Sequence, residues 1–203
     1  MKFTDLLKKY QKQIEDYWHN RMIPIDLWIV INRDLIQLNK VFDTKITNPR
    51  VLDFIEKTKD LPDDFKAYKT HYFIMKTLKI KYKRDIEVHN LPDYWQSPDE
   101  TVELGTGDCE DFTILWMKIM QLLGVPSYKC MAIVGMVDNG VKELHAYPVY
   151  FNGIRAVNMD LTCYVNVLMV SNRATFRIPN DKYLSMWWAF NWKSSYKKLY
   201  WVR

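Results

Sequence analysis

The sequence predicts an α+β fold in which a buried helix packs on an antiparallel β-meander. Residues 109–123 are apolar on nearly every side, a pattern typical of a helix enclosed by a core. Three short strand-like runs follow, separated by Asn-Gly dipeptides at 139–140 and 152–153. Asn-Gly between alternating apolar runs is the strongest short-range signal for a β-hairpin.

We expect residues 1–60 to form an N-terminal helical extension. An amphipathic stripe predicts a helix over 4–22 that ends before Pro24, and a second helical pattern covers 26–42. These helices either brace the core or dock onto a protein partner, and we favour bracing. Two further helical stretches lie between 51 and 80, where Leu61-Pro-Asp-Asp64 predicts the intervening turn.

The helix over 109–123 has clear limits. Gly107 and Asp108 mark its start, Gly124 suits the C′ position, and Pro126 prevents continuation. Cys109 therefore lies in the first turn, where unpaired backbone N–H groups and the helix dipole favour the thiolate. A lone cysteine is more often a small buried apolar residue, and a nucleophile also needs a base.

The second hairpin of the meander supplies a candidate base. If Asn152 and Gly153 form a two-residue loop, Phe151 pairs with Ile154, and the same register brings His145 opposite Asp160. Their Cβ atoms would then lie roughly 4.5–5.5 Å apart. A carboxylate at that position can fix the tautomer of an imidazole and stabilise its cation, so the residues favour a Cys-His-Asp triad.

Residues 61–170 are the expected catalytic core, and 171–203 form an aromatic and basic C-terminal segment. From Asp181 onward, apolar residues recur at three- and four-residue spacings and predict an amphipathic helix. Those residues are Leu184, Trp187, Trp188, Trp192, Tyr196, Leu199 and Tyr200. This aromatic face either packs within the chain or docks onto another subunit.

Several motifs resemble the bacterial transglutaminase-like cysteine proteinases, which belong to the papain-like transglutaminase superfamily. The matching runs are Asp93-Tyr-Trp-Gln-Ser-Pro-Asp-Glu-Thr101, Gly107-Asp-Cys-Glu-Asp-Phe112, Leu123-Gly-Val-Pro126, His145-Ala146 and Asn158-Met-Asp160. The resemblance covers about residues 65–165 and implies a transglutaminase-like (papain-like) core. It also implies Cys109 as nucleophile, His145 as general base and then acid, and Asp160 as the orienting carboxylate.

The resemblance also bears on cofactors. Some members of the family bind calcium beside the cysteine, and Asp108, Glu110 and Asp111 match that acidic cluster. The alternative is that these carboxylates cap the helix and complement its dipole. No organic cofactor is expected, and calcium is the one candidate ion.

Acyl transfer needs hydrogen-bond donors for the developing oxyanion. The backbone N–H of Cys109 is a natural donor because the nucleophile and the helix start coincide. The second candidate is the indole of Trp95 or the amide of Gln96, and core packing is the alternative for Trp95.

The leading functional hypothesis is a thiol hydrolase, a protease or amidase that acts on a protein or peptide through an acyl-enzyme. A transamidase that cross-links proteins would share every step except the last. The rival from another class is a structural or assembly component, for example of a phage particle, because small proteins resembling this family also occur in phage genomes. The flanking helices and the aromatic C-terminus motivate that rival.

Composition limits the remaining classes. The 203 residues carry a net charge of +5, which permits acidic partners without requiring nucleic acid, and nucleic-acid binding is disfavoured. Three cysteines, with Cys130 and Cys163 outside metal-ligand spacings, do not predict disulfides. The N-terminus lacks the apolar segment of a signal peptide, and no apolar run approaches a membrane span, so a cytoplasmic location is expected.

Overall fold

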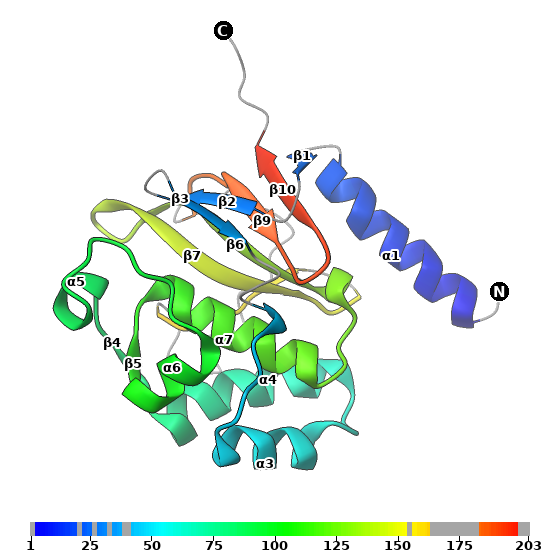
Figure 1. Ribbon diagram of the computed structural model, residues 1–203. Coiled ribbons are helices and arrows are strands. Elements are labelled where there is room, and N and C mark those ends of the chain that lie inside the picture. The colour runs from blue at the N-terminus through cyan, green and yellow to red at the C-terminus, as the bar shows by residue number, and fades with distance from the viewer. Residues whose placement is uncertain are drawn as a thin grey trace, which may run out of the picture.

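The computed structural model describes residues 3–19, 22–25, 28–31, 34–37, 42–153, 156–162 and 183–198. A six-stranded sheet of order β1-β10-β9-β6-β7-β8 forms one layer, and its neighbouring strands run antiparallel. Helix α7 lies against this sheet, and α3 and α4 lie on the far side of α7 (Figure 1). This arrangement confirms the predicted α+β class.

The described helices and strands have the following limits. The helices are α1 (Phe3–His19), α3 (Pro49–Thr58), α4 (Asp63–Tyr72), α5 (Asp85–Val88), α6 (Pro98–Leu104) and α7 (Cys109–Leu122), with helical turns η1 (Phe73–Leu78) and η2 (Ser127–Lys129). The strands are β1 (Met22–Ile25), β2 (Trp28–Ile31), β3 (Asp34–Gln37), β4 (Lys81–Tyr82), β5 (Thr106–Gly107), β6 (Cys130–Asp138), β7 (Lys142–Phe151), β8 (Ala156–Asn158), β9 (Trp188–Phe190) and β10 (Ser195–Lys198). Among these helices, none combines the length and apolar character needed to cross a bilayer.

Helix α7 is enclosed as its apolar sequence predicts. Every residue from 110 to 120 is buried, and the apolar members of this run supply much of the hydrophobic core. Leu123 is the C-cap, and Gly124 follows with a φ of +72°, a left-handed conformation that glycine adopts without a Cβ clash. The predicted helix and both of its limits are confirmed.

The meander β6-β7-β8 is also confirmed, but the calculated register of its second hairpin is wrong. Phe151 pairs with Ala156, not with Ile154 as the expected two-residue loop required. The pairing is therefore shifted by two residues. A shift of two keeps every side chain on its original face, because side chains alternate with a period of two.

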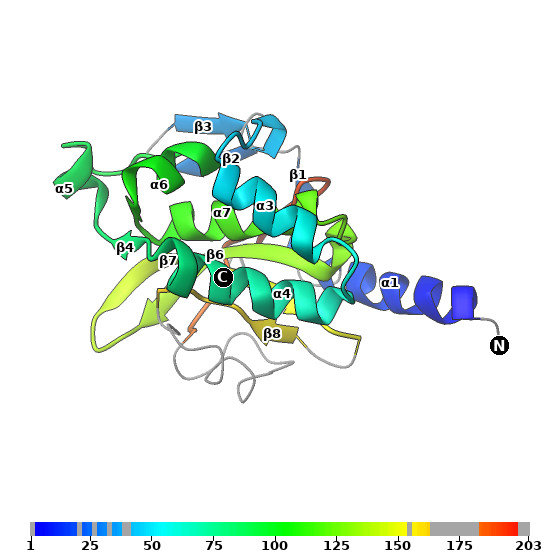
Figure 2. The same ribbon diagram turned by 90° about the horizontal axis from the view of Figure 1, so that it is seen from below.

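Helix α1 braces the body of the molecule through one face. Ile14 is buried, and the ring of Tyr10 meets that of Tyr128 edge-on at a centroid distance of 6.4 Å. The Tyr10 hydroxyl also accepts a hydrogen bond from the backbone N–H of Gly153. The N-terminal half of α1 projects away from the other elements (Figure 2).

The predicted helix over 26–42 is wrong where the structure describes it. Strands β2 and β3 pair as an antiparallel hairpin, with Ile29 opposite Ile36 and Val30 opposite Leu35. β-Branched residues are stiff and favour strands, and a short apolar run cannot be assigned to a helix or a strand by periodicity alone.

The predicted C-terminal helix is likewise wrong. Strands β9 and β10 pair antiparallel, with Ser195 opposite Phe190, and β9 also pairs with β6. The Asn191 side chain accepts hydrogen bonds from the backbone N–H groups of Lys193 and Ser194, both at 2.8 Å, and thereby stabilises the connecting turn. The beginning of the predicted helix at Asp181, and Leu199 and Tyr200 at its end, lie outside the described residues.

The segment Tyr183–Trp187, just before β9, runs alongside β6. Backbone N–H groups of Leu184 and Trp187 donate to the carbonyls of Met136 and Val134, both at 2.8 Å. A Cβ at Gly135 would overlap the Ser185 carbonyl, so the close approach of this segment requires glycine there.

We expect Gly135→Ala to destabilise the protein by about 3 kcal/mol, because the added methyl group has rigid backbone in its way. Gly140→Ala is the control. Its Cβ would meet nothing within 4 Å, and only the φ of +91° opposes it, which costs about 1 kcal/mol. Urea denaturation of both variants measures the difference. Equal losses would show that the segment does not depend on Gly135.

Candidate active site

Cys109 and His145 line the same cavity, which has a volume of about 800 Å³ and lies at the N-terminal end of α7. Cys109 comes from the first turn of this helix and His145 from β7. The cavity wall also includes apolar side chains, namely Ile86, Pro92, Trp95, Val134, Val141, Leu144 and Trp188. A thiol and an imidazole therefore face a partly apolar space large enough for part of a peptide.

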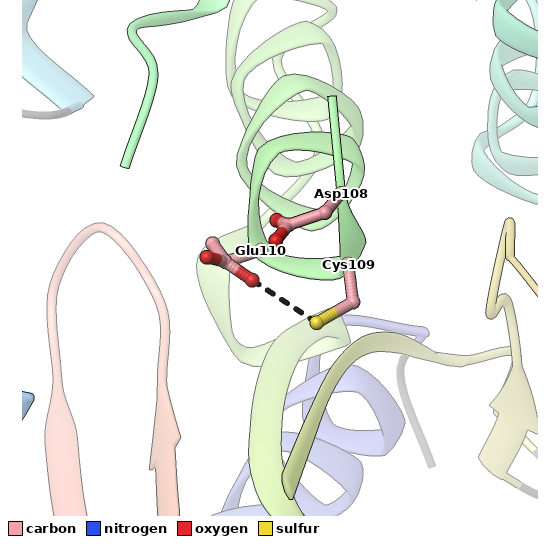
Figure 3. A group of neighbouring side chains, drawn as sticks. All are labelled: Asp108, Cys109 and Glu110. Atoms are coloured by element: carbon pink, nitrogen blue, oxygen red, sulfur yellow. Dashed lines mark hydrogen bonds between the residues drawn. The ribbon is translucent and has the colours of Figure 1, made fainter. Parts of the chain in front are cut away.

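The Cys109 thiol lies among carboxylates. Its Sγ donates a hydrogen bond to Oε2 of Glu110 at 3.0 Å (Figure 3). Burial and the charges of Glu110 and Asp108 raise the pKa of this thiol well above its ordinary value, although the backbone N–H of Ala146 opposes them. The expected preference for thiolate is thus reversed, because burial and neighbouring acids outweigh the helix N-terminus.

His145 and Asp160 are brought together as predicted. Nε2 of His145 lies 2.8 Å from Oδ2 of Asp160, and both side chains are buried. Extending the observed register places Asp160 opposite Tyr147, so His145 and Asp160 are diagonal neighbours on one face. Diagonal pairs are still within reach of long side chains, which explains why the contact forms despite the wrong register.

Asp160 is surrounded by hydrogen-bond donors. Oδ1 accepts from the backbone N–H and hydroxyl of Thr162, at 2.9 and 2.8 Å, and Oδ2 accepts from the Tyr183 hydroxyl at 2.8 Å. Burial alone would raise the pKa of Asp160, but His145, Thr162 and Tyr183 hold it well below its usual range. The carboxylate is therefore the resident form. Neither Thr162 nor Tyr183 was predicted from the sequence.

The acidic cluster is larger than the sequence indicated. The predicted Asp108, Glu110 and Asp111 are joined by Asp85 and Asp93, and one oxygen from each of Asp85, Asp93 and Glu110 lie within 4.8 Å of one another. Burial is the largest cause of a raised pKa for each of these five carboxyl groups, and the pKa reaches about 6 for Asp108 and about 8 for Asp111.

The five carboxyl groups divide by what they contact. Both oxygens of Asp111 accept backbone hydrogen bonds, from Gln96 at 2.8 Å and from Asp108 at 3.1 Å, which is the capping role considered as an alternative. In contrast, Oδ1 of Asp85 and Oδ1 of Asp108 are buried without a hydrogen-bond partner. Buried oxygens of this kind, next to further carboxylates, fit the ligand set that calcium prefers.

Asp85 reaches the site through a long-range contact. Strands β4 and β5 pair in parallel, with Tyr82 beside Gly107, so the residues that follow each strand are neighbours. The charged residues before Asp85 carry no signal for this site, and no spacing in the sequence links residues 85 and 108.

The two candidate oxyanion donors differ in position. Trp95 lines the cavity, and its indole N–H is buried without a hydrogen bond, although it is close enough to Asp93 to lower the pKa of that carboxyl group. Gln96 is buried outside the cavity lining, and its Nε2 lies 3.1 Å from Nε2 of His89. Of the two candidates, Trp95 is therefore the one that shares the cavity lining with Cys109.

Three solved structures of LapG from Legionella pneumophila are similar to this chain. The EGTA-treated form has a TM-score of 0.57 and 18% identity over 95% of this chain and 85% of LapG. A second form has a TM-score of 0.56 and 19% identity over 94% of this chain and 84% of LapG. The calcium-bound form has a TM-score of 0.56 and 19% identity over 92% of this chain and 87% of LapG. These likenesses show the transglutaminase-like fold that was expected. No protein-family model and no curated protein matches the sequence.

The acidic cluster predicts an unusual pH dependence. With a calcium chelator present, we expect the free energy of unfolding to fall as the pH rises from about 5 to 8. The pKa values of about 6 for Asp108 and about 8 for Asp111 exceed the roughly 3.9 of an unfolded aspartate, so the native state binds more protons than the unfolded state.

Urea denaturation at the two pH values measures this effect. Asp108→Asn should raise stability at pH 8 by about 2 kcal/mol relative to the wild type, since the amide mimics the protonated carboxyl. Asp53→Asn, in an exposed pair with Lys57, is the control and should leave the pH dependence unchanged. A wild type equally stable at both pH values would contradict the raised pKa values.

Proposed function

We propose that this protein is a cysteine-dependent hydrolase, a protease or amidase, with Cys109 as nucleophile. The observation that carries the proposal is that Cys109, at the start of a buried helix, and His145, already bonded to Asp160, line one cavity. The likeness to LapG supports a fold suited to this chemistry. A protein or peptide is the proposed substrate, and its scissile carbonyl would lie between Cys109 and His145.

The contact with Asp160 supports a division of roles between the two imidazole nitrogens. Asp160 is an ionised carboxylate and can only accept hydrogen bonds. Nε2 of His145 therefore carries a hydrogen atom and donates a hydrogen bond to Oδ2. Nδ1 is then the nitrogen that takes the proton of the Cys109 thiol as the sulfur attacks the carbonyl carbon. The same nitrogen returns the proton to the leaving amine, which breaks the C–N bond and leaves a thioester.

Hydrolysis completes the cycle. A water molecule gives a proton to Nδ1 of His145 as its oxygen attacks the thioester. The C–S bond then breaks, Nδ1 returns the proton to the sulfur, and the carboxylic acid product leaves. The backbone N–H of Cys109 and the indole N–H of Trp95 are the proposed donors to the oxyanion in both halves. The position of Trp95 in the cavity wall supports this role.

We further propose that calcium binds the acidic cluster through Asp85, Asp93, Asp108 and Glu110, with Asp111 holding the backbone around it. The unpartnered oxygens of Asp85 and Asp108 support this ligand set. When bound, the ion would neutralise the carboxylates that raise the pKa of Cys109. LapG has been solved both with calcium and after EGTA treatment.

The remaining alternatives differ in support. A transamidase would form the same thioester and pass it to an amine, so incorporation of a labelled primary amine into a substrate would distinguish it. The flanking helices and the aromatic C-terminal residues motivated the assembly hypothesis. Of those aromatic residues, Tyr196 is buried in the sheet, whereas Trp187 is exposed. No comparison supports a phage origin, and docking through α1 remains a prediction.

The nucleophile and base are tested by covalent labelling. With 1 mM calcium at pH 7, an epoxysuccinyl peptide should modify Cys109, whereas the fully buried Cys130 should stay unmodified. We expect His145→Ala to slow labelling by about 100-fold or more, the range of general base catalysis.

The matched control is His89→Ala, which alters a histidine outside the cavity lining and should keep the rate within about twofold. Mass spectrometry of digested protein identifies the site. Labelling that ignores His145→Ala would refute the proposed base.

Calcium is tested by thermal unfolding. Calcium at 1 mM should raise the Tm by about 5–10 °C relative to EGTA if its Kd is near 10 μM. The rise should be smaller at pH 5.5 than at pH 7.5, because protons compete for the same carboxylates. Glu110→Gln should abolish most of the calcium-dependent rise in Tm. Glu143→Gln, which alters a residue at the cavity wall but outside the acidic cluster, should leave this rise unchanged. An unchanged Tm at pH 7.5 would contradict the proposal that calcium binds the acidic cluster.

A further inference from the structure

We infer that Tyr183 is a positioning residue for the active site, which fixes the carboxylate that orients His145. This inference rests on the proposed function and adds a residue from the C-terminal segment to it. The Tyr183 hydroxyl donates to Oδ2 of Asp160 at 2.8 Å, and the same oxygen accepts from Nε2 of His145 at 2.8 Å. One carboxylate oxygen thus connects the tyrosine and the histidine.

The shared oxygen gives the hydroxyl a directional role. A carboxylate oxygen has two in-plane lone-pair directions, and Tyr183 occupies one while His145 uses the other. Thr162 holds the opposite oxygen, Oδ1, through its backbone N–H and its hydroxyl. With donors on both oxygens, the carboxylate cannot rotate about its Cβ–Cγ bond without breaking hydrogen bonds. The imidazole therefore has a fixed acceptor.

Tyr183 is itself rigidly placed beside the histidine. It is 2% exposed, and its ring packs on Tyr147 at a centroid distance of 4.5 Å. Tyr147 in turn stacks on the His145 ring at 6.0 Å with an interplanar angle of 18°. The tyrosine therefore approaches His145 by two routes, through the Asp160 oxygen and through the aromatic stack.

The backbone around Tyr183 is fixed relative to the same strand pair. Tyr183 forms a β-bridge with Val137, and the next residue bonds to the carbonyl of Met136. Gly135, which permits this close approach, lies directly opposite His145 in the β6–β7 register. The segment that carries the hydroxyl and the strand that carries the imidazole are thus positioned against the same part of β6.

Removing only the hydroxyl tests this role. In Tyr183→Phe, Asp160 loses a donor and the His145 ring loses its fixed partner, so the proton-transfer geometry degrades while the cavity keeps its shape. With the epoxysuccinyl peptide, we expect the maximal rate of Cys109 inactivation to fall about tenfold and the concentration for half-maximal rate to stay unchanged. A general loss of structure would alter both constants.

Tyr150→Phe is the matched control. Tyr150 is a buried tyrosine of β7 whose hydroxyl donates to Oδ1 of Asp64 at 2.6 Å, and it does not line the cavity. Both variants lose one hydroxyl–carboxylate bond, which is buried for Tyr183 and partly buried for Tyr150, so both should lower the Tm. Only Tyr183→Phe should slow inactivation. Equal inactivation rates in the two variants and the wild type would overturn the inference.

A second measurement does not depend on Cys109 chemistry. The ¹⁵N NMR signals of the neutral His145 ring should show the Nε2–H tautomer in the wild type and in Tyr150→Phe, and a mixture of tautomers in Tyr183→Phe. An unchanged spectrum in Tyr183→Phe would overturn the inference even if Cys109 proved inert. Failure of wild-type labelling with an altered Tyr183→Phe spectrum would instead refute the proposed hydrolase and retain the positioning role.

Discussion

The enclosure of α7 on all sides is the constraint on which the other elements depend. Burying an aliphatic or aromatic side chain contributes about 1.5–3 kcal/mol, and α7 is buried without interruption from residue 110 to 120. The sheet covers one side, and the helical layer covers the other (Figure 1). Even Lys118 is accommodated, because its ammonium donates to the carbonyl of Phe42 and to Oε1 of Gln121. A helix held in this way gives Cys109 a fixed position and a fixed direction.

The same enclosure explains why two groups of carboxylates in one site behave in opposite ways. Burial raises the pKa of an acid in both places, so the neighbours decide the outcome. Around Asp160 the neighbours are donors, and the ionised form is stabilised. Around Glu110 the neighbours are the acids Asp108 and Asp111, so the protonated form of the Glu110 carboxyl is stabilised. The Cys109 thiol beside these acids resists ionisation. Asp160 is therefore ionised at neutral pH, whereas the acidic neighbours of Cys109 oppose the ionisation of its thiol.

The sequence predicted those parts of the structure that depend on local signals. Helix α7 has marked ends, and the meander has turn dipeptides, so both were found. The contact of His145 with Asp160 survived an incorrect register because the error was two residues, which preserves the face of the sheet. The described parts of 26–42 and 181–200 were misassigned because short aromatic and aliphatic runs fit helical and strand periods alike. For the C-terminal strands, the decisive partners β1 and β6 lie far away in the chain.

The residues missed at the site share that long-range origin. Asp85 approaches Asp108 through the β4–β5 bridge, and Tyr183 reaches Asp160 across a gap of 23 residues along the chain. Neither residue carries the proposed chemistry. In the proposed mechanism they act on groups that do: Asp85 is a proposed calcium ligand near Cys109, and Tyr183 fixes the carboxylate that orients His145. In this fold a local hairpin and one helix terminus are sufficient to bring Cys109 and His145 to one cavity, and the proposed geometry and protonation of these groups then depend on long-range contacts.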